Sequence, residues 1–180
     1  MFLNIITPCS RPDNLLIIAN SIDIPKENYR WIIVFDSVTL PDSKLIPDNC
    51  EVYTYTDKKS ITGSSQRNFA LELINDGYVY SNDDDTIIHP DLWENIKDLD
   101  NDFISFDQVW SNGKPRLYGN TIKLNYVDNH NFIVHRSLIG DERFVIDRYD
   151  SDGVLAENCY NRCKNPKYIP KVLSTYNSLR

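Results

Sequence analysis

Three consecutive aspartates, Asp83, Asp84 and Asp85, directly follow the segment 77–82, which is apolar and has the composition of a β-strand. Adjacent carboxylates repel one another, and a cation bound among them would remove that cost. Mg²⁺ and Mn²⁺ prefer oxygen ligands and usually keep water and substrate phosphates in their coordination shell. The run therefore indicates a site for a divalent ion with a diphosphate, although aspartate is also common in the polar turns between strands and helices.

The composition limits the classes of protein to which the chain could belong. It has 180 residues, 41% of them hydrophobic and 25% charged, which suits one globular domain with a sizeable core. A net charge of −7 argues against nucleic acid or an anionic membrane as the main partner. No apolar stretch approaches membrane-spanning length, and the first residues are typical of a strand rather than a signal peptide. We therefore expect a cytoplasmic protein without a membrane span.

Cysteine spacing does not predict a zinc site. The four cysteines do not occur as two ligand pairs of the kind that structural zinc sites use. We expect reduced, partly buried thiols at Cys9, Cys50, Cys159 and Cys163.

Hydrophobic patterning in the first hundred residues predicts an α/β protein. We expect strands at Leu3–Thr7, Trp31–Phe35, Glu51–Tyr55 and Tyr78–Ser81, and helices at Pro12–Asn20, after a cap at Ser64 or Ser65, and at Pro90–Leu99. Strands that are apolar without interruption are typical of a sheet covered by helices on both faces.

The second half predicts further strands around one long helix. We expect strands at Phe103–Val109, Arg116–Leu124, Phe132–His135 and Lys167–Tyr176, and a helix at Ser151–Cys163. Ligands of open α/β sheets bind beyond the carboxyl ends of the strands. Because Asp36 and the aspartate run both follow such strand ends, we expect them to share one cleft.

Four motifs occur in order along the first half of the chain. They are Ile5-Ile-Thr-Pro-Cys-Ser-Arg-Pro12, Trp31-Ile-Ile-Val-Phe-Asp-Ser37, Gly63-Ser-Ser-Gln-Arg-Asn-Phe-Ala-Leu71 and Gly77-Tyr-Val-Tyr-Ser-Asn-Asp-Asp-Asp85. Each motif by itself is weak, but the ordered set resembles the GT-A class of nucleotide-sugar glycosyltransferases. The likeness is greatest to the inverting glucuronyltransferases.

This resemblance implies a single Rossmann-like GT-A domain over residues 1–180, with a mixed central sheet and helices on both faces. Residues 1–100, approximately, would form the nucleotide-binding half, and residues 101–180 the acceptor-binding half. The implied reaction moves a sugar from a nucleoside-diphosphate donor, UDP being the first choice, to a hydroxyl of a glycan or glycoconjugate, with Mn²⁺ or Mg²⁺ as cofactor. The donor sugar is not identified, because the family's uracil-stacking aromatic falls near Cys9 and Ser10 here.

The resemblance also implies residues for the donor and the metal. Asp85 would be the direct metal ligand, Asp36 would accept the uracil N3–H, and Arg67 would neutralise the diphosphate or orient the aspartate run. The full implied set of donor-binding residues is Thr7, Pro8, Arg11, Asp36, Arg67, Asp83 and Asp84. Because neighbouring side chains alternate at a strand end, we expect one of the three carboxylates to be structural.

Two segments of the second half resemble the acceptor side of the same family. Ser151-Asp-Gly-Val-Leu-Ala-Glu157 is similar to the start of the helix that carries the catalytic base, which implies that role for Asp152. Asp150 and Glu157 are the alternatives, and a plain helix cap at Asp152 is a further interpretation. Val127-Asp-Asn-His-Asn-Phe-Ile-Val134 resembles the acceptor-site strand, which implies that Asp128 and His130 bind the acceptor.

Two other functions stay open from the sequence. One is a sugar-1-phosphate nucleotidyltransferase, although the turn Thr7–Pro12 lacks the glycines that such enzymes usually carry after their first strand. The other is a nucleotide-sugar or glycan-binding module without catalysis. Turnover of a donor separates this last possibility from an enzyme.

Overall fold

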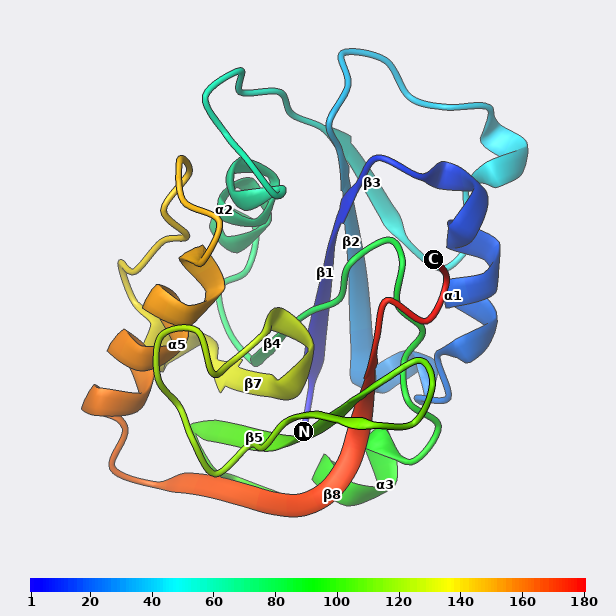
Figure 1. Ribbon diagram of the computed structural model, residues 1–180. Helices are drawn as coiled ribbons and strands as arrows, with labels where there is room; N and C mark the ends of the chain where they lie inside the picture. Colours follow the sequence, from blue (N-terminus) through cyan, green and yellow to red (C-terminus); the bar gives the residue numbers. More distant parts are fainter.

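A computed structural model describes all 180 residues and contains an eight-stranded mixed sheet (Figure 1). The strands are β1 (Leu3–Cys9), β2 (Tyr29–Phe35), β3 (Glu51–Thr54), β4 (Tyr78–Ser81), β5 (Phe103–Trp110), β6 (Pro115–Leu117), β7 (Phe132–His135) and β8 (Pro166–Tyr176). The spatial order is β3-β2-β1-β4-β7-β5-β6, with β8 paired to β5. The mixed central sheet predicted from the sequence is confirmed.

Helices cover both faces of this sheet, as expected. They are α1 (Leu15–Ser21), α2 (Ser64–Glu72), α3 (Leu92–Ile96), α4 (Arg136–Ile139) and α5 (Ser151–Arg162). Four short 3-10 turns complete the set: η1 (Pro12–Asn14), η2 (Lys26–Asn28), η3 (Ser43–Leu45) and η4 (Asn129–Asn131). Figure 1 shows α1 on one side of the sheet and α2 and α5 on the other.

Alternating side chains of the inner strands build one core on each face. In β1, Leu3 and Ile5 pack with α1 and α3, whereas Ile6 packs with α2 and α5. In β2, Trp31 belongs to the first core and Ile32 to the second. Both faces of these strands are buried, which explains why their sequences are apolar without alternation.

Parallel pairing brings three strand ends to one edge of the sheet. β1 pairs with both β2 and β4 in parallel, with Cys9 opposite Phe35 and Ile6 opposite Ser81. The segments that follow these strands therefore lie side by side at this edge, as expected for the carboxyl ends of parallel strands. Asp36 and the aspartate run lie at this edge.

The last strand returns the chain to that same edge. β8 runs parallel to β5 and ends at Tyr176, opposite Trp110. Beyond it, Leu179 N–H donates to the carbonyl of Asp85 at 2.8 Å, and Ile87 N–H donates to the Ser178 hydroxyl at 2.9 Å. Residues 177–180 are thus docked on the loop that carries the aspartates.

Most element boundaries differ from the sequence expectation by one to three residues, and the helix expected at Pro12–Asn20 is divided into η1 and α1. The strand expected at Arg116–Leu124 is limited to β6, and the chain turns at Gly119, where a Cβ would lie 2.5 Å from the Phe106 nitrogen. The helix expected at Pro90–Leu99 is shorter, because only Leu92–Ile96 is α-helical.

The cap expected at Ser64 or Ser65 is instead Gly63, which has a φ of 75°. A Cβ there would lie 2.6 Å from the Pro8 Cβ, so both the dihedral and the close approach favour glycine. The two serines are the first residues of the helix itself.

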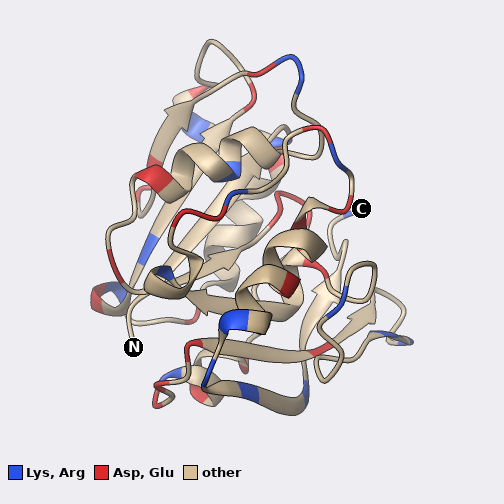
Figure 2. Ribbon diagram, turned by 90° about the vertical axis from the view of Figure 1, so that its left-hand side faces the viewer, with Lys and Arg blue, Asp and Glu red and all other residues tan.

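None of the helices has the length and apolar character needed to cross a membrane. The four cysteines are free thiols, in agreement with the sequence expectation. Figure 2 shows acidic and basic residues interspersed along the loops and helices in this view.

Candidate active site

A cavity of about 460 Å³ lies at the carboxyl edge of the parallel strands. Its wall combines residues of both halves of the chain and is predominantly polar. From the first half it contains Pro8, Cys9, Ser10, Arg11, Asp36, Thr62, Gly63, Gln66, Arg67, Asp83, Asp84 and Asp85, and from the second half Arg116, Asn125, Val127, Asp128, Asn129, Tyr149, Asp150, Ser151, Asp152, Tyr176, Asn177 and Arg180.

Asp84 is the carboxylate of the run that has a structural role. Its Oδ2 accepts the backbone N–H groups of Ser10 at 2.6 Å and Arg11 at 2.7 Å, and also the Ser10 hydroxyl at 3.1 Å. Its Oδ1 accepts from Arg11 Nη1 at 2.5 Å. With its acceptor positions filled by protein donors, Asp84 fastens the aspartate loop to the turn after β1.

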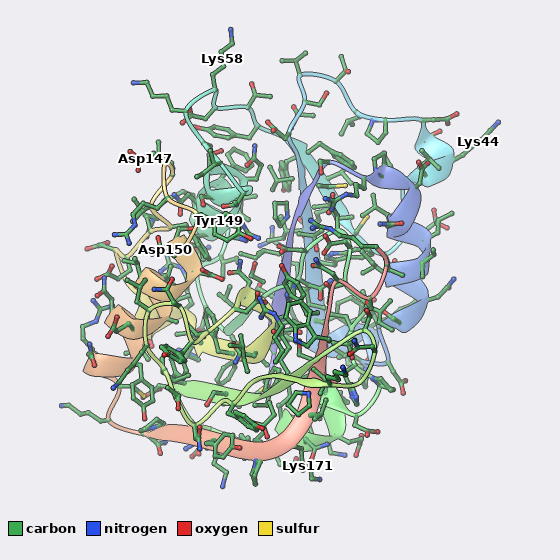
Figure 3. All side chains as sticks on the ribbon, viewed as in Figure 1. Lys44, Lys58, Asp147, Tyr149, Asp150 and Lys171 are labelled. Atoms are coloured by element: carbon green, nitrogen blue, oxygen red, sulfur yellow. The ribbon has the colours of Figure 1, made fainter.

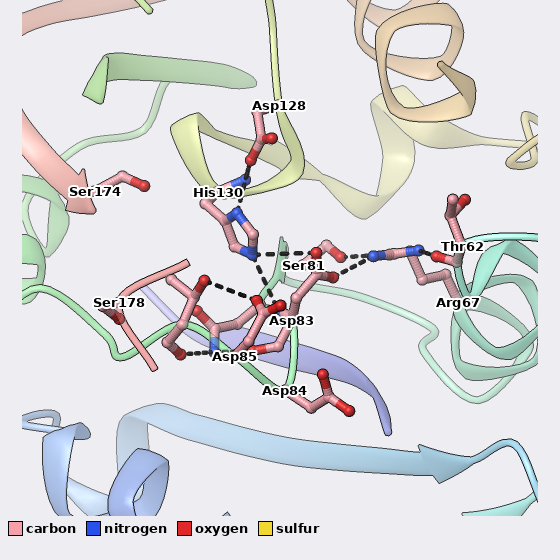
Figure 4. A network of polar contacts seen from close by, with 12 residues as sticks. Thr62, Arg67, Ser81, Asp83, Asp84, Asp85, Asp128, His130, Ser174 and Ser178 are labelled. Carbon is pink, nitrogen blue, oxygen red and sulfur yellow. Dashed lines mark hydrogen bonds and ion pairs between the residues drawn. The ribbon is translucent and has the colours of Figure 1, made fainter. Parts of the chain in front are cut away.

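Asp83 is oriented from the opposite side by Arg67. The Arg67 side chain is 2% exposed, donates through Nε to the Ser81 hydroxyl at 2.8 Å, and forms an ion pair through Nη2 with Asp83 Oδ1 (Figure 4). Its Nη1 donates to the Thr62 carbonyl at 2.5 Å. Of the two roles expected for Arg67, this geometry supports orientation of the aspartate run.

Asp85 is buried and paired with two guanidinium groups. Its Oδ2 lies 3.1 Å from Arg11 Nη1 and 2.6 Å from Arg180 Nε. Its Oδ1 accepts only the Thr86 hydroxyl, at 3.2 Å. The charge repulsion within the run is therefore relieved by arginines, so the run has counter-ions from the protein itself.

The carboxylate oxygens at this edge are the kind of ligand that a divalent ion binds, but Arg180 already occupies one of them. No group of three or more His, Cys, Asp or Glu side chains is arranged to hold a metal ion. Mg²⁺ is nevertheless commonly bound through one or two carboxylates plus substrate phosphates, and Asp83 and Asp85 can supply that number. The residues fit such an ion provided that it replaces Arg180 at Asp85.

Asp152 is the carboxylate of the cavity with the properties of a base. It lies in the first turn of α5, and its Oδ1 accepts the Gly153 N–H at 2.8 Å. Burial, reinforced by the negative charge of Asp128, raises the pKa of Asp152 to about 6, while the Gly153 N–H and Arg67 oppose the shift. A carboxylate with a pKa near 6 is deprotonated at neutral pH and binds a proton more readily than an ordinary aspartate.

The two alternatives to Asp152 are less suited to that role. Asp150 lines the cavity beside Tyr149 on the loop before α5 (Figure 3). It forms two bonds of 2.8 Å to Arg148, which lowers the pKa of Asp150. Glu157 is absent from the cavity wall and accepts the Leu124 N–H at 3.3 Å.

Asp128 lines the cavity, whereas His130 lies behind it. His130 is fully buried, with Nδ1 2.6 Å from Asp128 Oδ1. Asp128 also pairs with Arg116 at 3.2 Å, and these two partners hold the pKa of Asp128 low although burial alone would raise it. An acceptor in the cavity can contact Asp128 directly. His130 can act on it only through another residue, which corrects the expected direct contact.

The protonation of His130 follows from its second contact. Burial lowers the pKa of the His130 imidazole, whereas the carboxylates of Asp128 and Asp83 raise it. The Asp83 N–H nevertheless donates to His130 Nε2 at 2.9 Å, which requires a lone pair on that nitrogen. This hydrogen bond determines the protonation state of the imidazole, because a proton on Nε2 would point at the amide proton of Asp83. His130 is therefore neutral, with its proton on Nδ1.

The remaining predicted donor residues are divided between the cavity wall and the core. Pro8 and Arg11 line the cavity, and Asp36 does so with its Oδ1 accepting from Gln66 Nε2 at 3.1 Å. Thr7 does not, since it is 1% exposed and its hydroxyl accepts from Trp31 Nε1 at 3.0 Å. The expectation of a donor contact by the Thr7 side chain is therefore corrected.

Several wall residues were not predicted from the sequence. Arg116 lies with its guanidinium carbon 3.7 Å from the Tyr176 ring centroid and 5.2 Å from that of Trp110. Tyr149 is 78% exposed. Arg116, Tyr176 and Arg180 reach the cavity only through the pairing of β5 with β6 and β8, so no local motif could reveal them.

No family model matches the chain, and no curated protein matches it in sequence. Solved structures do resemble it. The structure of S. aureus TarS residues 1–349 has a TM-score of 0.77 at 17% identity, covering 97% of this chain and 60% of that one. The same protein in complex with UDP-GlcNAc gives 0.78 at 18% identity, with 97% and 58% covered.

A third similar structure is the mannosyltransferase PcManGT from Pyrobaculum calidifontis in complex with GDP-Man and Mn²⁺. Its TM-score is 0.73 at 14% identity, with 97% of this chain and 56% of that one covered. The chain thus spans about three fifths or less of these structures. It has the Rossmann-like GT-A fold of the glycosyltransferases that it resembles, and the comparisons do not single out the glucuronyltransferases.

Proposed function

We propose that this chain is a glycosyltransferase that moves a sugar from a nucleoside-diphosphate donor, with UDP as the first choice, to a hydroxyl of a glycan or glycoconjugate. The observation that carries the proposal is the placement of Asp152 in the same cavity as Asp36 and the aspartate run. A base with a raised pKa opposite a set of donor-binding residues is what an inverting transfer requires. Similar solved structures with UDP-GlcNAc or GDP-Man bound support the choice of donor class.

In the proposed reaction, the acceptor hydroxyl attacks the anomeric carbon of the donor sugar. As the new C–O bond forms, the hydroxyl proton moves to Asp152, and the bond from the anomeric carbon to the diphosphate oxygen breaks. The nucleoside diphosphate leaves with the bonding electrons, and a single displacement inverts the anomeric configuration. Asp128, fixed by His130 and Arg116, would orient the acceptor hydroxyls.

We assign the donor side to the edge of the parallel strands. Asp36 would accept the N3–H of the base, with Gln66 holding its carboxylate in place. Pro8 and Arg11 would contact the nucleotide from the cavity wall. Asp83, oriented by Arg67, would face the ribose or the phosphates. Mn²⁺ or Mg²⁺ held by Asp85 would supply Lewis-acid stabilisation of the leaving diphosphate.

The test of this function is turnover with a panel of UDP-sugars and GDP-mannose, supplied with mixed glycan acceptors. Release of UDP or GDP together with a glycosylated product of inverted configuration is the expected result. Retained configuration would overturn the single displacement and with it the role of Asp152. Binding of UDP without any turnover would favour a binding module, to which the arginine pairing of Asp85 also points.

A further inference from the structure

Five residues form a continuous chain of polar contacts beside the cavity, with an arginine at each end and His130 in the middle. Arg116 Nη1 lies 3.2 Å from Asp128 Oδ2, and Asp128 Oδ1 lies 2.6 Å from His130 Nδ1. The Asp83 N–H donates to His130 Nε2 at 2.9 Å, and the Asp83 carboxylate pairs with Arg67. Figure 4 shows the inner members of this chain, with His130 between the two aspartates.

His130 is the member of this chain that joins the two halves of the protein. Asp83 follows β4, in the half assigned to the donor, and Asp128 precedes β7, in the half assigned to the acceptor. Both aspartates line the cavity, whereas His130 is fully buried and does not. The imidazole therefore contacts each side of the site without being able to touch a bound molecule.

The backbone around His130 holds the imidazole in one place. Asp128 and Asn131 form a capping box around η4, and the His130 N–H donates to Asp128 Oδ1 at 3.1 Å. A ring fixed in this way sets the position of whatever its two nitrogens contact.

We propose that His130 is a positioning residue that holds the donor-side Asp83 and the acceptor-side Asp128 at a fixed relative position. Its Nδ1–H donates to the Asp128 carboxylate, and its Nε2 accepts the Asp83 amide, so each nitrogen serves one side of the site. This inference rests on the proposed function, because it takes Asp83 to contact a nucleotide donor. It adds that the two sides are aligned through one buried side chain.

Two substitutions separate the two contacts, because the amide of asparagine reaches about as far as Nδ1 of histidine and that of glutamine about as far as Nε2. His130→Asn keeps a donor for Asp128 and loses the acceptor for the Asp83 amide. His130→Gln keeps an acceptor for Asp83 and loses the donor to Asp128. A purely structural role would make the two variants alike except in stability.

UDP affinity by calorimetry reports the donor side. Acrylamide quenching of Trp110 reports the acceptor side, because this 43% exposed ring contacts Arg116 and the other two tryptophans are buried. We expect His130→Asn to weaken UDP binding about tenfold with unchanged quenching. We expect His130→Gln to change quenching with UDP affinity within about twofold of the wild type.

Tyr80→Phe is the matched control, since it removes a bond to the His130 carbonyl and leaves both ring contacts in place. It should lower stability without changing either readout. Equal UDP affinities in His130→Asn and the wild type would overturn the proposal, as would parallel losses in the Asn and Gln variants. If the wild type binds neither UDP nor GDP, the proposed function fails, and this inference fails with it.

A measurement on the unmodified protein covers the case in which the variants do not fold. UDP should shift the imidazole ¹⁵N resonances of His130, which contacts Asp83 and Asp128 of the cavity wall. Those of His89 and His135 should stay unchanged, because their rings contact Asp91 and Ser137, which lie outside the wall. A His130 signal that does not respond to saturating UDP would overturn the proposal.

Discussion

Arg180 Nε lies 2.6 Å from Asp85 Oδ2, so a guanidinium group neutralises the carboxylate that the sequence assigns to a metal ion. The contact is reinforced by the Leu179 N–H, which donates to the Asp85 carbonyl. Arg11 contacts the same oxygen from the opposite half of the cavity wall. A divalent ion would have to compete with Arg180 for Asp85, which makes metal affinity a measure of this contact.

Replacing Arg180 by glutamine should therefore strengthen metal binding in the absence of nucleotide. Removal of the competing charge is expected to raise the affinity for Mn²⁺ about tenfold, which corresponds to about 1.4 kcal/mol. Calorimetric titration with Mn²⁺ measures this directly, and Asp85→Asn should abolish binding. Arg143→Gln is the matched control, because Arg143 pairs with Glu72 outside the cavity. Identical Mn²⁺ affinities in Arg180→Gln and the wild type would contradict the competition.

Asp152→Asn should remove the catalytic step and leave donor binding in place. Loss of a positioned base typically costs about 10²–10⁴ in rate. In the wild type, kcat/KM should rise with pH through the pKa of about 6, because only the ionised carboxylate can accept the proton. Turnover as a function of pH, together with UDP affinity, checks both points. A variant with near-normal turnover would move the role to Asp150.

The same substitution should stabilise the protein at neutral pH. The pKa of Asp152 is raised from 3.8 to about 6, so the folded state binds a proton more tightly than the unfolded state does. The resulting cost is absent well below the unfolded pKa of 3.8, grows as pH rises, and is complete above the folded pKa, where it amounts to at most about 3 kcal/mol.

Denaturant unfolding at pH 8 and at pH 4 measures this difference. Asp152→Asn should be more stable than the wild type at pH 8, and most of this advantage should be lost at pH 4, which is close to the unfolded pKa of 3.8. A variant that is equally destabilised at both pH values would show that Asp152 acts mainly as a helix cap.

Arg67→Lys should destabilise the fold as well as weaken donor binding. An ammonium group cannot replace the three separate contacts of Arg67 with Ser81, Thr62 and Asp83. Leaving buried acceptors unpaired should cost about 2–4 kcal/mol. Urea unfolding measures the loss, with Arg162→Lys as the control, because Arg162 pairs with Glu142 at the surface. A change as small as that of the control would place Arg67 outside the supporting network.

The sequence predicts those parts of the fold that depend on interactions between residues near one another in the chain. Continuous apolar runs identified β1, β2 and β4 because both faces of these strands are buried. The sequence from Arg116 to Leu124 predicts a strand because Tyr118, Thr121 and Ile122 favour one, whereas Gly119 packs closely against the backbone of Phe106 and the chain turns there. The close contact between Gly119 and Phe106 depends on the neighbouring strand β5. In the sequence, the only sign of it is one glycine.

The sequence predicts which carboxylates lie in the site, but it does not predict which side chains pair with them. Aspartates after strand ends could be placed at one edge, since parallel strands must end there. Arg180 and Asp85 are far apart in sequence, and their contact depends on the path of β8. The burial of His130 and the orientation of Thr7 toward Trp31 likewise follow from packing across the sheet.

The central claim is tested most directly by following donor breakdown, using UDP-GlcNAc and GDP-mannose with mixed glycan acceptors and with inorganic pyrophosphate in parallel. The account predicts release of UDP or GDP coupled to transfer of the sugar, with no release by Asp152→Asn. Formation of a nucleoside triphosphate from the donor and pyrophosphate would instead identify a nucleotidyltransferase. A folded protein that releases no nucleoside diphosphate from any donor would contradict the claim that this cavity transfers sugars.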